Sequence, residues 1–238
     1  MHDALIEISV HVVAIGALAV LAARATGSRL RTGWLLVALL LVLLRDALVL
    51  RGYGLVPDVF PGSDWAWTGK LLATAGLLAV AALPWFGLRR CGVTLQQAPG
   101  ARAAWIVFAV VAVAIFALAF AYRDGPDDLD TILFQWTMPG LEEELFYRGV
   151  LLLACNEALD SGHRHRLAGI GWGGVLACVA FGLGHALFYR KGDLSFDAMA
   201  FALTGGPALL IAWFRARTGS LALPVLAHNV ANGAPTLL

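Results

Sequence analysis

Three consecutive glutamates stand inside an otherwise apolar stretch of this chain, and they are the residues best suited to do chemistry. The segment MPGLEEELFYRGVL, residues 138–151, contains Glu142, Glu143 and Glu144, followed by Arg148. Ionisable side chains are costly at membrane depth, so such a cluster is a functional-site hypothesis. A carboxylate buried in this way can take a proton from water as a general base.

The spacing within the cluster predicts different roles for its members. On a helix, Glu144 and Arg148 share a face with the acid N-terminal to the base, which favours an ion pair. Glu143 points about 100° away from Glu144. We therefore expect Glu143 to face a different cavity that contains no built-in cation, and to be the acid that accepts a proton.

Two further polar motifs, near the end of the chain, complete a candidate site. FGLGH contains Phe181 and His185, and HNVAN contains His228 and Asn232, so the outer members of each motif share a helical face. A glutamate with two histidines is the ligand set of many catalytic zinc sites. It equally suits a base with groups that orient water. A lone membrane histidine is more often a packing residue, but this combination on separate helices favours a site.

The composition indicates that the glutamates and histidines of these motifs lie inside a membrane. Of the 238 residues, 60% are hydrophobic and 14% charged, and the mean hydropathy is +0.77, far more apolar than a soluble domain. The formal net charge of +1 leaves no basic surplus for nucleic acid. Cys91, Cys155 and Cys178 form no C-x-x-C pair, and we expect all of them to be structural.

The apolar segments predict an all-α bundle of about eight transmembrane helices, since one crossing takes about 20 residues. We interpret residues 1–238 as a single transmembrane domain whose motif-bearing core is 131–238. The predicted spans are Leu5–Ala25, Gly33–Leu50, Trp65–Gly87, Ala104–Tyr122, Thr131–Leu159, Gly169–Tyr189, Phe196–Arg215 and Ser220–Thr236.

Helix breakers predict distortion at two places. Pro139 and Gly140 precede the acidic cluster, and Gly205, Gly206 and Pro207 fall in the seventh predicted span. Backbone groups freed in lipid must find partners in protein or in a water-filled cavity. Both places are therefore predicted to border an internal cavity. The many glycines of the sixth span predict close approach of its neighbours.

Polar residues within the first two predicted spans are interpreted as structural. Glu7 and His11 are four residues apart, and Arg45 precedes Asp46. Pairing or snorkelling to the interface accounts for such groups. The first four spans thus contribute no predicted site residue.

Loop charges predict the orientation, because Lys and Arg accumulate in cytoplasmic loops. The loops after the odd-numbered spans are rich in arginine, whereas the alternate loops are rich in aspartate and include Lys70 among their few basic residues. We therefore expect an integral protein of a bacterial inner membrane with both termini outside the cytoplasm. The site would open towards the extracytoplasmic half of the membrane.

The motifs together resemble those of one family. E-E-x-x-x-R (Glu143, Glu144, Arg148), F-x-x-x-H and H-x-x-x-N, in this order, resemble the motifs of the CAAX protease and bacteriocin-processing family of intramembrane proteases, also called the Abi family. The flanks LEEELFYRGVL and TGSLALPVLAHNVAN are similar too, so the resemblance covers roughly the second half of the chain. One such motif is weak, but the ordered set is specific.

The resemblance implies catalytic roles within an eight-helix core. Glu143 would be the general base on a water, and His185 would help to hold that water or a metal. His228 and Asn232 would polarise the scissile carbonyl and stabilise the oxyanion.

The resemblance also implies supporting residues, and it leaves the cofactor open. Glu144, Arg148 and Phe181 would maintain the geometry of the site. One alternative is a single divalent metal, zinc first, held by Glu143, His185 and His228. The other is no cofactor, which the absence of the H-E-x-x-H signature favours.

The function that we predict is an intramembrane endopeptidase acting on a membrane-associated polypeptide. It would perform C-terminal processing, peptide maturation or sorting-signal cleavage. The Ala- and Leu-rich, Lys-poor composition suggests a GC-rich bacterial genome and favours a peptide or sorting signal over a prenylated protein. The alternatives are a proton-coupled transporter, although no repeated halves are evident, and a non-catalytic immunity or scaffold protein on the same fold.

Overall fold

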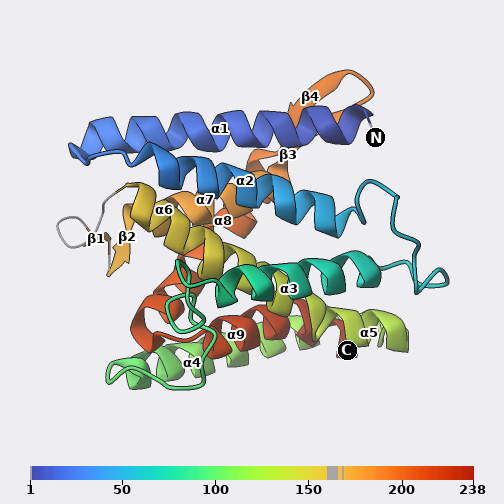
Figure 1. Cartoon of the computed structure of the whole chain (residues 1–238). Coiled ribbons are helices and arrows are strands. Elements are labelled where there is room, and N and C mark those ends of the chain that lie inside the picture. The colour runs from blue at the N-terminus through green and yellow to red at the C-terminus, as the bar shows by residue number, and fades with distance from the viewer. Residues whose placement is uncertain (1, 160–165, 168) are drawn as a thin grey trace.

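The computed structural model describes residues 2–159, 166–167 and 169–238, which form an all-α helical bundle as predicted (Figure 1). Both termini lie at one end of the bundle, and the connection between the first two helices lies at the other. The α-helices are α1 (His2–Thr26), α2 (Thr32–Val49), α3 (Trp67–Ala82), α4 (Ala101–Ala121), α5 (Leu129–Gln135), α6 (Leu152–Ala158), α7 (Trp172–Ala186), α8 (Ala198–Thr218) and α9 (Ala222–Gly233).

Short elements connect and interrupt these helices. Two π-helices, η1 (Pro139–Glu143) and η2 (Leu145–Leu151), lie between α5 and α6, and a 3-10 helix, η3 (Ala234–Leu237), follows α9. Two antiparallel hairpins are formed by β1 (Arg166–Leu167) with β2 (Ile170–Gly171), and by β3 (Leu187–Arg190) with β4 (Asp193–Phe196).

All eight predicted spans coincide with helical segments, but not all of those helices are long. Within the described part of the chain, α1, α2, α4 and α8 are long and apolar enough to cross a membrane, whereas α3 and α7 are shorter apolar helices. The count of eight crossings therefore stays a prediction.

The predicted distortion at Pro139 and Gly140 is confirmed, because π-helical turns replace the α-helix there. Proline has no N–H to donate. The amide of Gly140 donates instead to Asn229 Oδ1 of α9, at 2.9 Å. Single π-helical turns inside helices are often found at functional sites.

The glycines and the proline of the seventh span do not interrupt its helix. Helix α8 continues from Ala198 to Thr218 through Pro207. A proline is tolerated within a membrane helix where neighbours and local adjustments satisfy the freed carbonyl. Gly205 packs closely against α7, since a Cβ built on Gly182 of that helix would lie 3.2 Å from the Gly205 Cα.

The predicted end of the sixth span at Tyr189 is also wrong, because α7 ends at Ala186 and the β3–β4 hairpin follows. Lys191 and Gly192 adopt φ values of 53° and 93° at its turn, as a two-residue type I′ turn requires. Glu7 of α1 accepts the amide of Tyr189 at 2.8 Å. The hairpin is thereby attached to α1.

Close helix packing at Gly173 confirms the expectation from the glycine-rich segment. A Cβ built on Gly173 would lie 2.2 Å from the backbone nitrogen of Asn156 on α6. Real Cβ atoms do not approach backbone so closely, so α6 and α7 pack at a distance that only glycine permits here.

A helix cap lies near one end of the bundle, and a group of ion pairs lies near the other. Asp128 caps α5 by accepting the amide of Thr131 at 3.0 Å and its hydroxyl at 2.8 Å. These bonds stabilise the charged carboxylate and lower its pKa. Near the opposite end, Glu157 binds Arg31 and Arg90, each at 2.7 Å. Such exposed pairs contribute little to stability.

We expect Gly173→Ala to destabilise the bundle, because the added methyl group must push α6 and α7 apart. Overpacking of this kind costs about 1 to 3 kcal/mol. The matched control is Gly206→Ala, since a Cβ at Gly206 meets nothing within 4 Å. Thermal unfolding in detergent should show a lower midpoint for Gly173→Ala alone. Equal midpoints would contradict the packing argument.

Candidate active site

The glutamate cluster lies on and beside η1, in the interior of the bundle. Glu142 and Glu144 have no exposed surface, whereas Glu143 keeps 9%. Buried carboxylates of this kind need cations or hydrogen-bond donors close by. Each glutamate finds a different set of them.

Glu142 binds two cations from the N-terminal half of the chain. Arg45 of α2 donates to both of its oxygens, from Nε to Oε1 at 2.8 Å and from Nη2 to Oε2 at 2.9 Å. Lys70 of α3 donates to Oε2 at 2.7 Å. Bidentate arginine pairs fix geometry as well as charge, so α2 and α3 are anchored to η1.

Glu143 also has a cation, and the prediction that it has none is wrong. Lys70 Nζ lies 2.5 Å from Glu143 Oε1, and Arg45 Nη2 lies 3.9 Å from the same oxygen. The charge pattern of the sequence places Lys70 in a loop, whereas the structure buries it within α3. Arg45 likewise belongs to the cluster rather than to a local pair with Asp46. Sequence spacing does not reveal contacts between helices that are distant in the chain.

Glu144 pairs with Arg148, as predicted. Arg148 Nη1 lies 2.9 Å from Glu144 Oε1, and both side chains are buried. The same oxygen lies 2.7 Å from His228 Nδ1. Since a carboxylate accepts hydrogen bonds, Nδ1 carries the proton. The other ring nitrogen, Nε2, then faces Glu143 Oε2 at 3.8 Å.

Phe181 brings the two motif histidines together. Its ring centroid lies 4.5 Å from that of His185 and 5.9 Å from that of His228. The guanidinium of Arg148 lies over the same ring, at 4.6 Å. His185 Nδ1 lies 2.9 Å from the carbonyl oxygen of Phe181. Arg148 of η2, His185 of α7 and His228 of α9 therefore surround one aromatic ring.

Two asparagines of α9 contact the broken helix. Asn232 Nδ2 donates to Gln135 Oε1 at 3.3 Å. Asn229, which the sequence analysis did not select, accepts the amide of Gly140. A Cβ on Gly140 would lie 2.2 Å from Asn229 Oδ1 and 2.7 Å from the Val225 carbonyl oxygen. Asn229 thus holds η1 against α9, and its place inside the HNVAN motif was the signal available in the sequence.

A lysine of the chain itself lies beside the carboxylate that was predicted as a possible metal ligand. The described residues contain no group of three or more His, Cys, Asp and Glu arranged to hold one. The ammonium group of Lys70 donates a hydrogen bond to Glu143 Oε1 at 2.5 Å. A cation already occupies the position at which a metal would neutralise this carboxylate.

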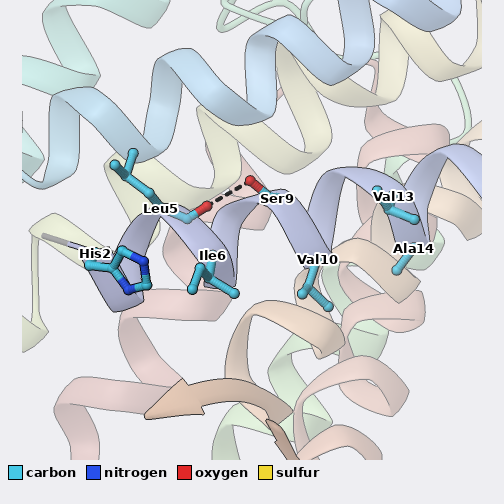
Figure 2. Close-up of a pocket in the computed structure, with 7 residues that line it drawn as sticks. All are labelled: His2, Leu5, Ile6, Ser9, Val10, Val13 and Ala14. Carbon is cyan, nitrogen blue, oxygen red and sulfur yellow. Dashed lines mark hydrogen bonds between the residues drawn. The ribbon is translucent and has the colours of Figure 1, made fainter. Parts of the chain in front are cut away.

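Two grooves lie outside the charged cluster. One, of about 450 Å³, is apolar and runs between α3, α9 and the Leu141 and Leu145 side chains of the π-helices. The other, of about 590 Å³, follows one face of α1 alone, from His2 to Ala14 (Figure 2). Only the first groove borders the helix that carries the glutamates.

Comparison with family models gives one match. Residues 125–234 match the type II CAAX prenyl endopeptidase Rce1-like model. The matched residues, which we call the Rce1-like region, make up less than half of the chain, and the match agrees with the family that the motifs resemble. The chain matches no curated protein and no solved structure.

The Rce1-like region contains all the predicted site residues, and the match supports a protease of an intramembrane type. The apolar helices agree with an integral membrane protein. Arg45 and Lys70 lie outside the matched region. The N-terminal helices therefore supply the cations of a cluster whose acids belong to the Rce1-like region.

We expect Lys70→Met to lower the stability of the folded protein. Removing one partner of a buried ion pair costs about 3 to 5 kcal/mol, and here the lost cation serves both Glu142 and Glu143. The matched control is Lys191→Met, which removes an exposed lysine of the β3–β4 turn. Folded yield and the unfolding midpoint measure the effect. A Lys70→Met protein as stable as the control would refute this role.

Proposed function

We propose that this chain is an intramembrane endopeptidase that hydrolyses a peptide bond of a membrane-associated polypeptide through a water activated by Glu143. The observation that carries the proposal is the gap of 3.8 Å between Glu143 Oε2 and His228 Nε2. A separation of this size is longer than a direct hydrogen bond and allows one water to bridge the two atoms.

The surrounding ion pairs leave this pair of atoms available. Lys70 engages Glu143 Oε1, so Oε2 is the oxygen that faces His228. Glu144 accepts from His228 Nδ1, which fixes the ring and its tautomer. A base within hydrogen-bond reach of water and a fixed neighbouring imidazole are what general base catalysis requires.

The reaction follows from these positions. Glu143 takes a proton from the bridging water while the water oxygen attacks the carbonyl carbon of the substrate. The negative charge moves from Glu143 to the carbonyl oxygen, where the side-chain N–H of Asn232 stabilises it. His228 Nε2 carries no proton, so it accepts a hydrogen bond from the water before the attack. The C–N bond then breaks, and the proton on Glu143 passes to the departing amine.

His185 and Asn232 complete the proposal as groups that contact the substrate or the water. His185 is half-buried beside Phe181 and is held by a carbonyl. Asn232 makes a long bond of 3.3 Å to Gln135, which an incoming oxyanion can replace. Donors aimed at developing negative charge are a large source of catalysis.

The substrate that we propose is an apolar polypeptide segment, cleaved in C-terminal processing, peptide maturation or sorting-signal removal. The apolar groove beside Leu141 and Leu145 supports this class of substrate, because apolar grooves bind apolar side chains. The Lys-poor composition suggests a GC-rich bacterial genome. In such an organism we propose a peptide or a sorting signal as the substrate rather than a prenylated protein. No nucleic acid takes part.

We propose an inner-membrane location in a bacterium, with both termini outside the cytoplasm. Both termini lie at the same end of the bundle, which supports an even number of membrane crossings (Figure 1). The arginines of the opposite end, including Arg31 and Arg90, support a cytoplasmic position for that end.

Glu143→Gln should abolish peptide cleavage and leave the fold intact, because glutamine keeps the shape but cannot accept the proton. A peptide library reconstituted with purified enzyme in vesicles provides the assay. The matched control is Glu157→Gln, which removes a carboxylate at the far end of the bundle and should keep full activity. A Glu143→Gln enzyme that cleaves normally would exclude this base.

Glu144→Gln should behave differently, since it breaks a buried ion pair. We expect less folded protein as well as less cleavage, because Arg148 is left without its carboxylate at a cost of about 3 to 5 kcal/mol. Normal stability with complete inactivity would make Glu144 the base instead.

Chelation separates the two cofactor alternatives, of which we propose the metal-free one. A chelator such as EDTA should leave cleavage unchanged, and elemental analysis of the purified enzyme should find no stoichiometric zinc. Added zinc should not raise the rate. Loss of cleavage on chelation with recovery on adding zinc would establish the metal alternative.

A further inference from the structure

Besides these two grooves, a polar cavity of about 200 Å³ lies between α1, α2, η2 and α7. Its polar lining consists of Glu7, His11, Arg45, Asp46 and Tyr147. Except for Tyr147, these residues lie in the N-terminal half of the chain, outside the Rce1-like region. This polar cavity is distinct from the apolar groove and from the groove along α1 in Figure 2.

The side chains of the polar cavity have hydrogen-bonding capacity to spare. Glu7 Oε2 accepts the Tyr189 amide, Asp46 Oδ2 accepts the Tyr53 hydroxyl at 3.0 Å, and His11 Nε2 lies 3.2 Å from a carbonyl oxygen. The second oxygen or nitrogen of each has no protein partner among the described residues. Polar atoms in such a place are normally satisfied by ordered water.

The size and charge of the polar cavity suit water better than any other ligand. At about 30 Å³ per molecule it has room for roughly six waters, which is too small for a peptide. Two carboxylates oppose an anion, and Arg45 opposes a cation. Within the described chain no metal-binding group of three acids, histidines or cysteines occurs here.

The inner wall of the polar cavity is also the wall of the glutamate cluster. Arg45 lines the cavity and donates to Glu142, and its Nη2 lies 3.9 Å from Glu143. Tyr147 lines the cavity as well, and its ring lies 5.0 Å from Phe181, which touches His228. One layer of side chains therefore separates the polar cavity from the proposed catalytic atoms.

The apolar groove borders a different face of the same π-helices. Leu141 and Leu145 line that groove, whereas Phe146 and Tyr147 line the polar cavity. A substrate in the apolar groove would cover the site from one side. Hydrolysis consumes one water for each bond, so water must then arrive from another side.

We propose that the polar cavity is a hydrated reservoir that supplies water to Glu143 past Arg45 and Tyr147. This inference rests on the proposed function for the use of the water, but the presence of the water is independent of it. Water reaches the reservoir from the end of the bundle at which the β3–β4 hairpin meets α1, where Glu7 contacts Tyr189.

Cysteine labelling tests the hydration. We would introduce Ala180→Cys on α7 or Val42→Cys on α2, both in the wall of the polar cavity, and Val110→Cys on α4 as a control that is 67% exposed on the apolar surface. The native cysteines are buried and stay in place. A small water-soluble methanethiosulfonate in vesicles, read by peptide mass spectrometry, measures each rate.

We expect the cysteines of Ala180→Cys and Val42→Cys to be labelled at least tenfold faster than that of Val110→Cys. The reagent requires an ionised thiol, and ionisation requires water. Rates at both cavity positions equal to that of the lipid-facing control would overturn the proposal. Two cavity positions on different helices protect the test against the misfolding of one variant.

Filling the cavity tests the supply of water. Ala180→Leu, with Val42→Met as a second variant, should lower kcat at least fivefold and leave KM unchanged, since peptide binding is not affected. The matched control is Ala14→Leu in the outer groove of α1 (Figure 2), which should keep the wild-type kcat. The kcat of a filling variant is compared with that of the wild type only if the variant keeps the wild-type unfolding midpoint.

Filling variants that fold and keep the wild-type kcat would overturn the supply role. A wild-type chain that cleaves no peptide would instead refute the proposed function, and the labelling rates alone would then decide whether the cavity is hydrated.

Discussion

The structure depends on the neutralisation of three adjacent buried carboxylates. Removing a charge from water costs several kcal/mol even after relaxation, and this cost is recovered only with close and well-oriented partners. Arg45, Lys70 and Arg148 provide three cations for three glutamates at distances of 2.5 to 2.9 Å. Because Arg45 and Lys70 come from α2 and α3, this requirement fixes the N-terminal helices against η1.

The π-helical turns allow two adjacent glutamates to approach the same histidine. Glu143 and Glu144 are neighbours in the sequence, yet both must approach His228, one at Nε2 and the other at Nδ1. Pro139 interrupts the regular ladder, and Asn229 satisfies the amide of Gly140 that the interruption frees. The wider π-helical turn reduces the angle between adjacent side chains. The distortion therefore serves the site as well as the packing of α9.

The sequence was sufficient to predict what depends on local pattern. Apolar length predicted where helices occur, and motif spacing predicted the Glu144–Arg148 pair and the grouping of His185 with His228. It was not sufficient for Lys70, because hydropathy locates a helix but not its rotation or its neighbours. The β3–β4 hairpin was missed for a similar reason. Its segment is apolar enough to read as the end of a span, and only the turn at Lys191 and Gly192 separates the two structures.

Charge balance explains why such a cluster can take part in a reaction without coming apart. Three carboxylates and three cations leave the buried group neutral while His228 is neutral. When Glu143 takes a proton, Lys70 loses the charge of its partner, and this alone would be costly in a medium of low dielectric. In the proposed reaction the same negative charge reappears on the carbonyl oxygen a few ångströms away, so the cluster as a whole stays neutral. Lys70 and Arg45 then need only to tolerate a shift of charge, and a fixed set of cations placed by α2 and α3 stabilises both ends of that shift. In the proposed reaction, the N-terminal helices thus contribute to catalysis through the electrostatic environment of Glu143.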